Sequence, residues 1–204
     1  MINSSDAYAY FKEKEREYKR YGYDVVRERK AFLKWTGLSN GPVLEIGTGR
    51  GYFTACLSEL NLPVVSVDLD KDMLDFAQAF MFAWAGRSDM ANTDVEFVRA
   101  PSPYSFPFAD NSFSAIVSFN MWHHVEDSYA LLPEINRLLK DKGTLLLADF
   151  SDKGFDLVSR LHLKNYGEPH PVLRRGFRDV RDFFKLPFQE YHSEYEEGIK
   201  LVKR

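Results

Sequence analysis

Short apolar runs alternate along the chain with longer segments in which apolar residues recur at helical spacing. The runs expected to form buried strands are 42–46, 64–67, 95–99, 115–119 and 143–150. Helices are expected between them at 52–60, 71–85 and 127–140, with Asp70 and Asp127 as caps and Pro133 as a kink or late start. Runs this apolar are typical of strands that are covered on both faces. The alternation therefore predicts an α/β fold with a doubly wound, mostly parallel sheet.

The first forty residues depart from this alternation and are expected to be helical. Residues 6–21 carry several tyrosines among many charged side chains. A second helix places Val25, Phe32 and Thr36 on one stripe and ends at Gly37, because glycine readily adopts the left-handed conformation that closes a helix. Both helices are interpreted as a cover over the sheet.

The chain changes character again after residue 150. Residues 151–173 contain Gly154, Gly167, Pro169 and Pro171 and are expected to be irregular, whereas 174–185 are expected to be helical. The segments 188–195 and 199–203 are expected to form a closing hairpin that turns at Glu197-Gly198. This hairpin would give a seven-stranded sheet an antiparallel C-terminal edge strand.

Composition narrows the class of protein. The 204 residues suit a single domain, divided into a helical cover (1–40), a cofactor-binding core (41–150) and a substrate-side segment (151–204). A net charge of −3 gives no general attraction to nucleic acid, and the single cysteine, Cys56, excludes a disulfide framework. With no apolar run long enough to span a bilayer and no signal-peptide pattern, a cytoplasmic protein without a membrane partner is expected. The oligomeric state is not set by the sequence.

The candidate chemistry lies in a glycine-rich loop after the first predicted strand. Gly47, Gly49 and Gly51 follow that strand, and Asp68 ends the next apolar run. Glycine lets the backbone turn sharply and approach a ligand closely. An acid at the end of the second strand is placed to accept both hydroxyls of a ribose. The pattern indicates a nucleoside-containing cofactor at the carboxyl edge of the sheet.

Two residues bear on which cofactor is bound. A dinucleotide fingerprint requires a third glycine where this chain has Tyr52. Glu45, close before Gly47, would repel a pyrophosphate and favour a cationic ligand. S-adenosylmethionine carries a ribose, a positive charge and no phosphate, so it fits better than a nicotinamide cofactor. A nicotinamide-dependent oxidoreductase is kept as a less favoured alternative.

From Pro42 onward the chain resembles the class I S-adenosylmethionine-dependent methyltransferases. The segment 45–51 is similar to the first motif of that family, 68–77 to its second, and 106–113 to the segment before its fourth strand. The resemblance implies a Rossmann-like methyltransferase fold, S-adenosylmethionine as cofactor and an unidentified small-molecule methyl acceptor. The residues that would bind the cofactor are Glu45, Gly47, Thr48, Gly49, Asp68, Leu69, Met73, Ser102 and Asn120.

One departure from the family pattern follows the third predicted strand. The family usually has an acid there that receives the adenine amino group, whereas this chain has Ala100-Pro101-Ser102-Pro103. Ser102 or a backbone carbonyl would replace the acid through a weaker bond. Weaker cofactor affinity is therefore expected, and a non-catalytic S-adenosylmethionine-binding module is the second alternative.

The fourth predicted strand is followed by His123 and His124, the best-placed titratable groups of the chain. The near-neutral pKa of imidazole suits either residue to accept a proton from a nucleophile. We expect first a structural or cofactor-shaping role, then a general base. A shared metal ranks last, because neighbouring side chains on an extended segment point to opposite sides. No metal is therefore expected.

Two further groups are candidate substrate contacts. The N-terminal Tyr10, Tyr18 and Tyr21 belong either to a plain cover or to a lid that closes on the substrate. Arg174 and Arg178 lie on a late helix and would suit an anionic small molecule, although charged residues on such a helix usually form a solvated face.

Overall fold

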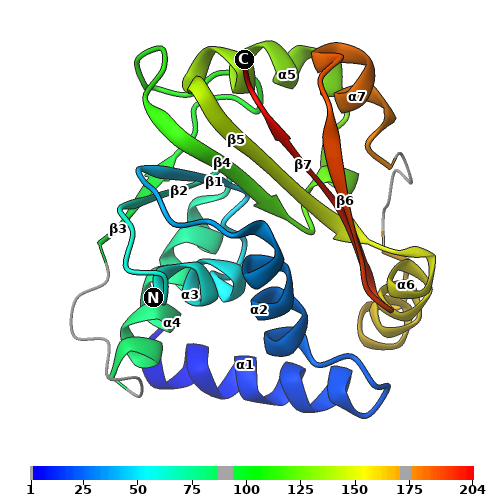
Figure 1. Ribbon diagram of the computed structural model, residues 1–204. Helices are drawn as coiled ribbons and strands as arrows, with labels where there is room; N and C mark the ends of the chain where they lie inside the picture. Colours follow the sequence, from blue (N-terminus) through cyan, green and yellow to red (C-terminus); the bar gives the residue numbers. More distant parts are fainter. Residues whose placement is uncertain (1, 87–93, 171–175) are drawn as a thin grey trace.

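The computed structural model describes residues 2–86, 94–170 and 176–204. Its centre is a seven-stranded sheet in the order β3-β2-β1-β4-β5-β7-β6 (Figure 1). The strands are β1 (Val43–Ile46), β2 (Val64–Asp68), β3 (Val95–Arg99), β4 (Phe113–Phe119), β5 (Leu139–Phe150), β6 (Phe188–His192) and β7 (Glu196–Val202). The first five are parallel, and β7 runs antiparallel to both of its neighbours. The predicted fold class is confirmed.

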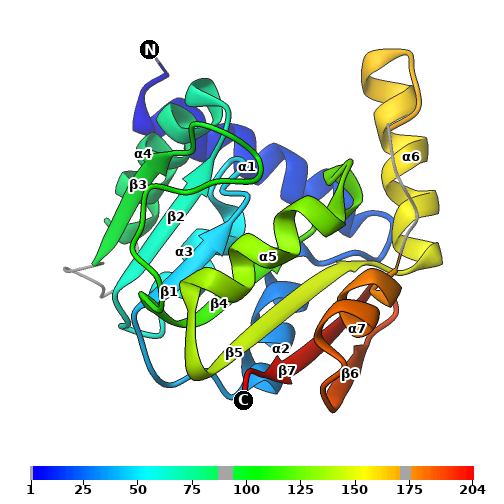
Figure 2. The same cartoon turned by 90° about the horizontal axis from the view of Figure 1, so that it is seen from above.

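Helices cover both faces of the sheet (Figures 1 and 2). On one side lie α2 (Val25–Thr36) and α3 (Tyr52–Ser58), and on the other α5 (Ser128–Leu138) and α7 (Arg178–Phe184). The remaining helices are α1 (Ser4–Lys19), α4 (Lys71–Ala85), α6 (Asp152–Tyr166) and the short 3₁₀ helix η1 (Trp122–His124). None of the described helices combines the length and the apolar character needed to cross a bilayer.

The alternation of side chains in the central strands divides the core between the two helical layers. In β1, Val43 packs in the cluster that contains Phe32 of α2, whereas Leu44 packs in the cluster that contains Leu132 of α5. Successive residues of a strand point to opposite faces, so a strand that lies between two helical layers is buried on both faces. All four residues of β1 are buried.

The helix boundaries follow the predicted caps. Asp70 accepts a hydrogen bond from the Asp72 N–H at 2.8 Å, and Asp127 accepts one from the Ala130 N–H at 3.0 Å. Gly37 closes α2 with a φ of 63°. Pro133 lies inside α5. The helix ends at Leu138, and β5 begins at the next residue.

The expectation of an irregular segment after residue 150 was wrong. Residues 152–166 form α6, capped by Ser151 and ended by Gly167 at a φ of 81°. Gly154 occupies the first turn, where a Cβ would collide with the Tyr195 carbonyl oxygen. The two glycines thus mark a close approach and a helix end, not a loop. Residues 171–173 lie outside the described residues.

The turn of the C-terminal hairpin was also misplaced. It lies at Ser193–Tyr195, where the Ser193 hydroxyl accepts the N–H groups of Tyr195 and Glu196. Gly198 is inside β7, where a Cβ would lie 2.6 Å from the Leu147 carbonyl oxygen. Glycine is needed there because the backbone of β5 lies this close, with Cε2 of Phe32 on α2 at 3.2 Å as a second contact. The antiparallel strand is accordingly internal, and the edge strand is β6.

The late helix is shorter than expected. It begins at Arg178, and Phe177 and Val180 are buried. Residues 174 and 175 of the predicted helix lie outside the described residues.

Candidate functional site

A cleft with a volume of about 560 Å³ opens where β1, β2 and β4 end. The carboxyl ends of parallel strands on either side of a change in strand order are the usual place for a ligand in such sheets. The cleft is mostly apolar, with a few polar groups. It is lined by Ile46, Gly47, Gly49, Val67, Asp68, Leu69, Ala100, Pro103, Tyr104, Phe106, Asn120, Met121, His124, Val125, Glu126 and Leu131.

The three glycines of the loop after β1 have two different purposes. Gly47 has a φ of 89°, and a Cβ there would lie 2.5 Å from Cγ of Met121. Gly51 has a φ of 78°, and its Cβ would lie 2.9 Å from Cβ of Ala77 on α4. A Cβ on Gly49 would meet nothing within 4 Å. Gly47 and Gly51 therefore permit tight packing, and Gly49 presents bare backbone to the cleft.

Asp68 is held with its carboxylate at the cleft. Its Oδ2 accepts the Gly49 N–H at 2.7 Å and its Oδ1 accepts the Asp70 N–H at 3.0 Å. A carboxylate oxygen accepts more than one hydrogen bond, so both oxygens retain capacity for a ligand. Two fixed acceptors on one group suit a vicinal diol. The predicted ribose contact is compatible with this geometry.

Glu45 lies beneath the loop and does not line the cleft. It is 1% exposed, and its Oε2 accepts the hydroxyls of Thr54 at 2.7 Å and Ser66 at 2.6 Å. Thr48, also expected at the ligand, is buried and hydrogen-bonds Ser66 at 2.7 Å. Burial raises the pKa of Glu45 to about 7, against the opposing effect of these hydroxyls. Both residues therefore support the loop from behind.

The loop after β3 contributes apolar residues that were not predicted as ligand contacts. Pro103, Tyr104 and Phe106 line the cleft, while Ser102 does not. The Ser102 hydroxyl instead accepts the Tyr104 N–H at 3.2 Å within its own turn. Met73, expected beside the adenine, is half-buried outside the lining. Pro103 and Tyr104, which follow Ser102, could have indicated a ligand contact in the sequence, because flat apolar side chains are suited to pack on a purine.

Asn120 lies in the cleft at the end of β4, in a backbone conformation with a φ of 55°. Its Nδ2 donates to Oε1 of Glu196 at 3.1 Å, and the Tyr23 hydroxyl donates to the same oxygen. Glu196 is completely buried, which raises its pKa to about 8. This cluster ties the end of β4 to β7 and to the segment before α2.

The two adjacent histidines differ in position. His123 is 2% exposed, and its backbone N–H and its ring Nδ1 contact the two carboxylate oxygens of Asp149 at 2.7 and 2.6 Å. His124 lines the cleft, and burial lowers its pKa to about 4. The segment is the 3₁₀ helix η1 and not an extended strand, so the two ring centroids lie 4.0 Å apart. The expectation that the side chains point to opposite sides was wrong.

Tyr10, Tyr18, Tyr21 and Arg178, the candidate substrate residues that the structure describes, do not line the cleft. The Tyr10 hydroxyl lies 3.5 Å from that of Tyr166, Tyr18 packs on Tyr23 with ring centroids 5.5 Å apart, and Tyr21 is 46% exposed. Arg178 is exposed and lies 3.5 Å from Asp182. Arg174 lies outside the described residues. For the described members of this group, substrate contact stays a prediction.

Comparison with known proteins agrees with this geometry. Residues 44–147, more than half of the chain, match the family model described as a methyltransferase domain. The uncharacterized methyltransferase YcgJ of Bacillus subtilis is 31% identical over 168 residues, which cover 78% of this chain and 64% of that protein. A demethylmenaquinone methyltransferase of Clavibacter sepedonicus is 33% identical over 120 residues, covering 58% and 44%. The chain thus spans between about two fifths and two thirds of these relatives.

A solved structure extends the comparison to the whole fold. A SAM-dependent methyltransferase from Aquifex aeolicus superposes with a TM-score of 0.68 over 100% of both chains at 18% identity. At this identity the similarity concerns the fold alone. The family model, in contrast, rests on the sequence that forms the glycine loop, Asp68 and the central strands. The chain belongs to the class I S-adenosylmethionine-dependent methyltransferase family.

Proposed function

We propose that this protein binds S-adenosylmethionine in the cleft and transfers its methyl group to a small molecule. The observation that carries the proposal is Asp68, whose two oxygens are fixed by the N–H groups of Gly49 and Asp70. The bare backbone of Gly49 beside it leaves room for a ribose. A cytoplasmic location, expected from the sequence, is part of the same proposal.

Several cleft residues are suited to hold the cofactor. Asp68 would accept the ribose hydroxyls, and Leu69, Pro103 and Tyr104 would enclose the adenine between apolar surfaces. Asn120 lies at the end of β4 with its Oδ1 unpartnered among the described residues. A buried polar atom without a partner is costly, so it is an acceptor available to the amino group of the methionine moiety.

The cofactor supplies a methyl group that is already activated by a positively charged sulfur. The task of the protein is to align an acceptor with that methyl group and to exclude water. The apolar walls formed by Val125 and Leu131 contribute to the exclusion. His124 presents a neutral imidazole to the same space, and the role of His123 or His124 as a general base stays a prediction.

A small-molecule acceptor is supported by the relatives and by the shape of the site. The Clavibacter sepedonicus relative is named as a demethylmenaquinone methyltransferase. A cleft of about 560 Å³ has the size of a small-molecule site. Family membership favours this function over a nicotinamide-dependent oxidoreductase.

Calorimetric titration with S-adenosylmethionine and with its demethylated product tests the proposal. We expect a Kd in the micromolar range for the wild type, about −8 kcal/mol. Asp68→Ala should weaken binding at least about 100-fold, because it removes charge-assisted hydrogen bonds worth about 1.5–3 kcal/mol each. Asp75→Ala is the matched control, since Asp75 is an exposed carboxylate of α4 that pairs with Lys71 outside the cleft.

Failure of the wild type to bind either compound would overturn the proposal, as would equal affinity in Asp68→Ala. Binding without methyl transfer to any of a panel of quinol, phenol and amine acceptors would favour the non-catalytic alternative.

A further inference from the structure

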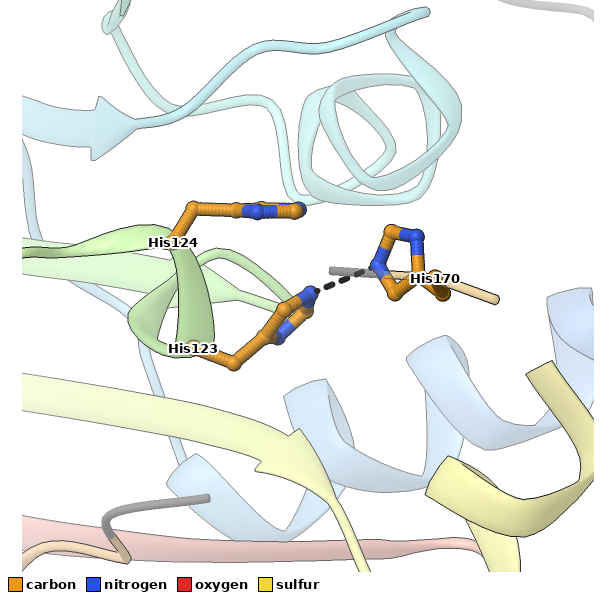
Figure 3. A group of neighbouring side chains, drawn as sticks. All are labelled: His123, His124 and His170. Atoms are coloured by element: carbon orange, nitrogen blue, oxygen red, sulfur yellow. Dashed lines mark hydrogen bonds between the residues drawn. The ribbon is translucent and has the colours of Figure 1, made fainter. Parts of the chain in front are cut away.

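We propose that His123, His124 and His170 form a binding site for a divalent transition-metal ion, with zinc as the best-fitting ion. Nitrogen atoms of the three rings lie within 4.8 Å of one another. Figure 3 shows the rings of His123 and His124 projecting from η1 and the ring of His170 meeting them from the segment after α6. His170 is 47 residues from His123 in the sequence, so the fold brings it to the two adjacent histidines.

The distance between nitrogen atoms of two of the rings matches the distance between two ligand atoms of one metal ion. Nε2 of His123 lies 3.2 Å from Nε2 of His170. Two imidazole nitrogens at 2.0–2.1 Å from a tetrahedral zinc ion are about 3.3–3.4 Å apart. This pair therefore needs almost no movement to bind one ion.

His124 completes the set after a small movement. Nitrogens no more than 4.8 Å apart must approach by up to roughly 1.5 Å to reach the ligand spacing of a tetrahedral site. The His124 side chain is exposed on the cleft wall, so its rotation displaces little packed structure. The 3₁₀ turn already holds its ring beside that of His123, at a centroid distance of 4.0 Å.

Asp149 orients the central ring for metal binding. Its Oδ1 lies 2.6 Å from Nδ1 of His123 and its Oδ2 accepts the His123 backbone N–H at 2.7 Å. A carboxylate at Nδ1 holds the ring proton there, so Nε2 keeps a lone pair, which faces Nε2 of His170. The buried position of His123 prevents the ring from turning. This arrangement of carboxylate, imidazole and open lone pair is the usual outer support of a zinc ligand.

The donor atoms select the class of ion. Three imidazoles suit zinc, copper or nickel, whereas magnesium and calcium require oxygen ligands. Three protein ligands leave a tetrahedral ion one further position, for water or for an oxygen atom of a molecule in the cleft. An ion there would act as a Lewis acid on that oxygen. The site itself does not depend on the methyltransferase proposal.

Titration of chelator-treated, dialysed protein with zinc chloride by calorimetry tests the inference, with cobalt(II) absorption spectra as a second readout. We expect one ion per chain with a micromolar or lower Kd, and cobalt bands typical of tetrahedral coordination. His124→Ala and His170→Ala should each raise the Kd at least tenfold. Asp149→Asn should raise it about 10- to 100-fold, because it removes the support of His123.

His192→Ala is the matched control, since His192 is an exposed histidine of β6 outside the cluster. It should leave the Kd unchanged. Neither His124 nor His170 is fully buried, and thermal unfolding checks that their variants fold. Absence of zinc binding by the folded wild type, or zinc binding that both variants retain in full, would overturn the site. Because S-adenosylmethionine binding is measured on the same chelated protein, failure of one proposal is separable from failure of the other.

Discussion

Glu196 has no exposed surface, and its Oε1 accepts hydrogen bonds from Tyr23 and Asn120. Its other oxygen has no partner among the described residues. Arg29 and Asp149 are the further charged groups that act on it, with opposite signs. Burial dominates these influences and raises the pKa to about 8, so the folded protein favours the protonated carboxyl.

The raised pKa of Glu196 predicts how stability changes with pH. In the unfolded chain its pKa is near 4.5, below the folded value of about 8. The folded state therefore binds the proton more tightly, and its contribution to stability declines as pH rises from about 4.5 to about 8. Glu196→Gln resembles the protonated form. We expect it to have little effect at pH 5 and to raise the free energy of unfolding by on the order of 2 kcal/mol at pH 8.5.

Urea unfolding of the wild type and Glu196→Gln at both pH values measures this effect. Glu190→Gln is a control on a carboxylate of the exposed edge strand, where its partner is Arg181. Equal shifts in the two variants, or a shift that is larger at pH 5, would contradict the assignment.

Gly47 allows a second prediction at the level of one residue. Gly47→Ala places a methyl group against Met121 at a positive φ and should destabilise the fold by about 3 kcal/mol. Gly37→Ala also has a positive φ but meets nothing within 4 Å, and should cost about 1 kcal/mol. Chemical denaturation compares the two, and equal losses would show that the Met121 contact is unimportant.

The positions of some candidate site residues could be predicted from the sequence, because the backbone alone determines them. Asp68 and Gly49 lie in the cleft because the end of a strand and a bare peptide fix their position. The positions of Glu45 and Ser102 outside the cleft lining could not be predicted, because their side chains find partners inside the protein. Which neighbours a polar side chain reaches depends on packing between distant segments, and spacing along the chain does not contain that information. For the same reason the approach of His170 to His123 was not foreseen.

At the scale of elements, α1 packs as part of the core. Phe11 is 2% exposed and contacts Tyr8, Tyr52, Phe80 and Trp84. Its ring thus joins α1 to both α3 and α4. The amphipathic-cover interpretation accounts for these contacts, whereas a lid would have to break them in order to open.

Phe11→Ala should therefore cost about 3–5 kcal/mol of unfolding free energy, the usual loss for a buried phenylalanine. Tyr21→Ala should change stability by less than about 0.5 kcal/mol, because Tyr21 is 46% exposed. Thermal or urea unfolding measures both. A small loss for Phe11→Ala would indicate that α1 is only loosely attached.

The elements that were predicted correctly have local signals. Apolar runs and Asp caps determine the first five strands and the helices between them. α6 was not predicted because Gly154 and Gly167 are typical of loops. In the structure Gly154 permits a close contact with Tyr195, and Gly167 ends the helix. Glycine alone does not distinguish a turn from a close approach, as Gly198 also shows.

At the scale of the whole molecule, the strand order separates the cofactor side from the C-terminal side. β1 and β4 are adjacent in the middle, and the cleft opens over their ends. The later strands lie beyond β5, and α6 stands at that end of the sheet (Figure 2). The cleft residues given by β1 and β2 follow from the family pattern. His124 follows β4 and lines the same cleft, whereas His170 comes from the segment after α6.

The internal position of β7 has a consequence for biosynthesis. β5 has β7 as its neighbour, so that side of β5 stays without a partner until residues 196–202 have been made. At a translation rate of about 5–20 residues per second, the delay after residue 150 is roughly 3 to 10 seconds. During this interval the nascent chain exposes an apolar strand edge to the ribosome surface and to chaperones. The protein is therefore expected to depend on co-translational protection, and slower translation of residues 151–195 would prolong the period in which this edge is open to aggregation.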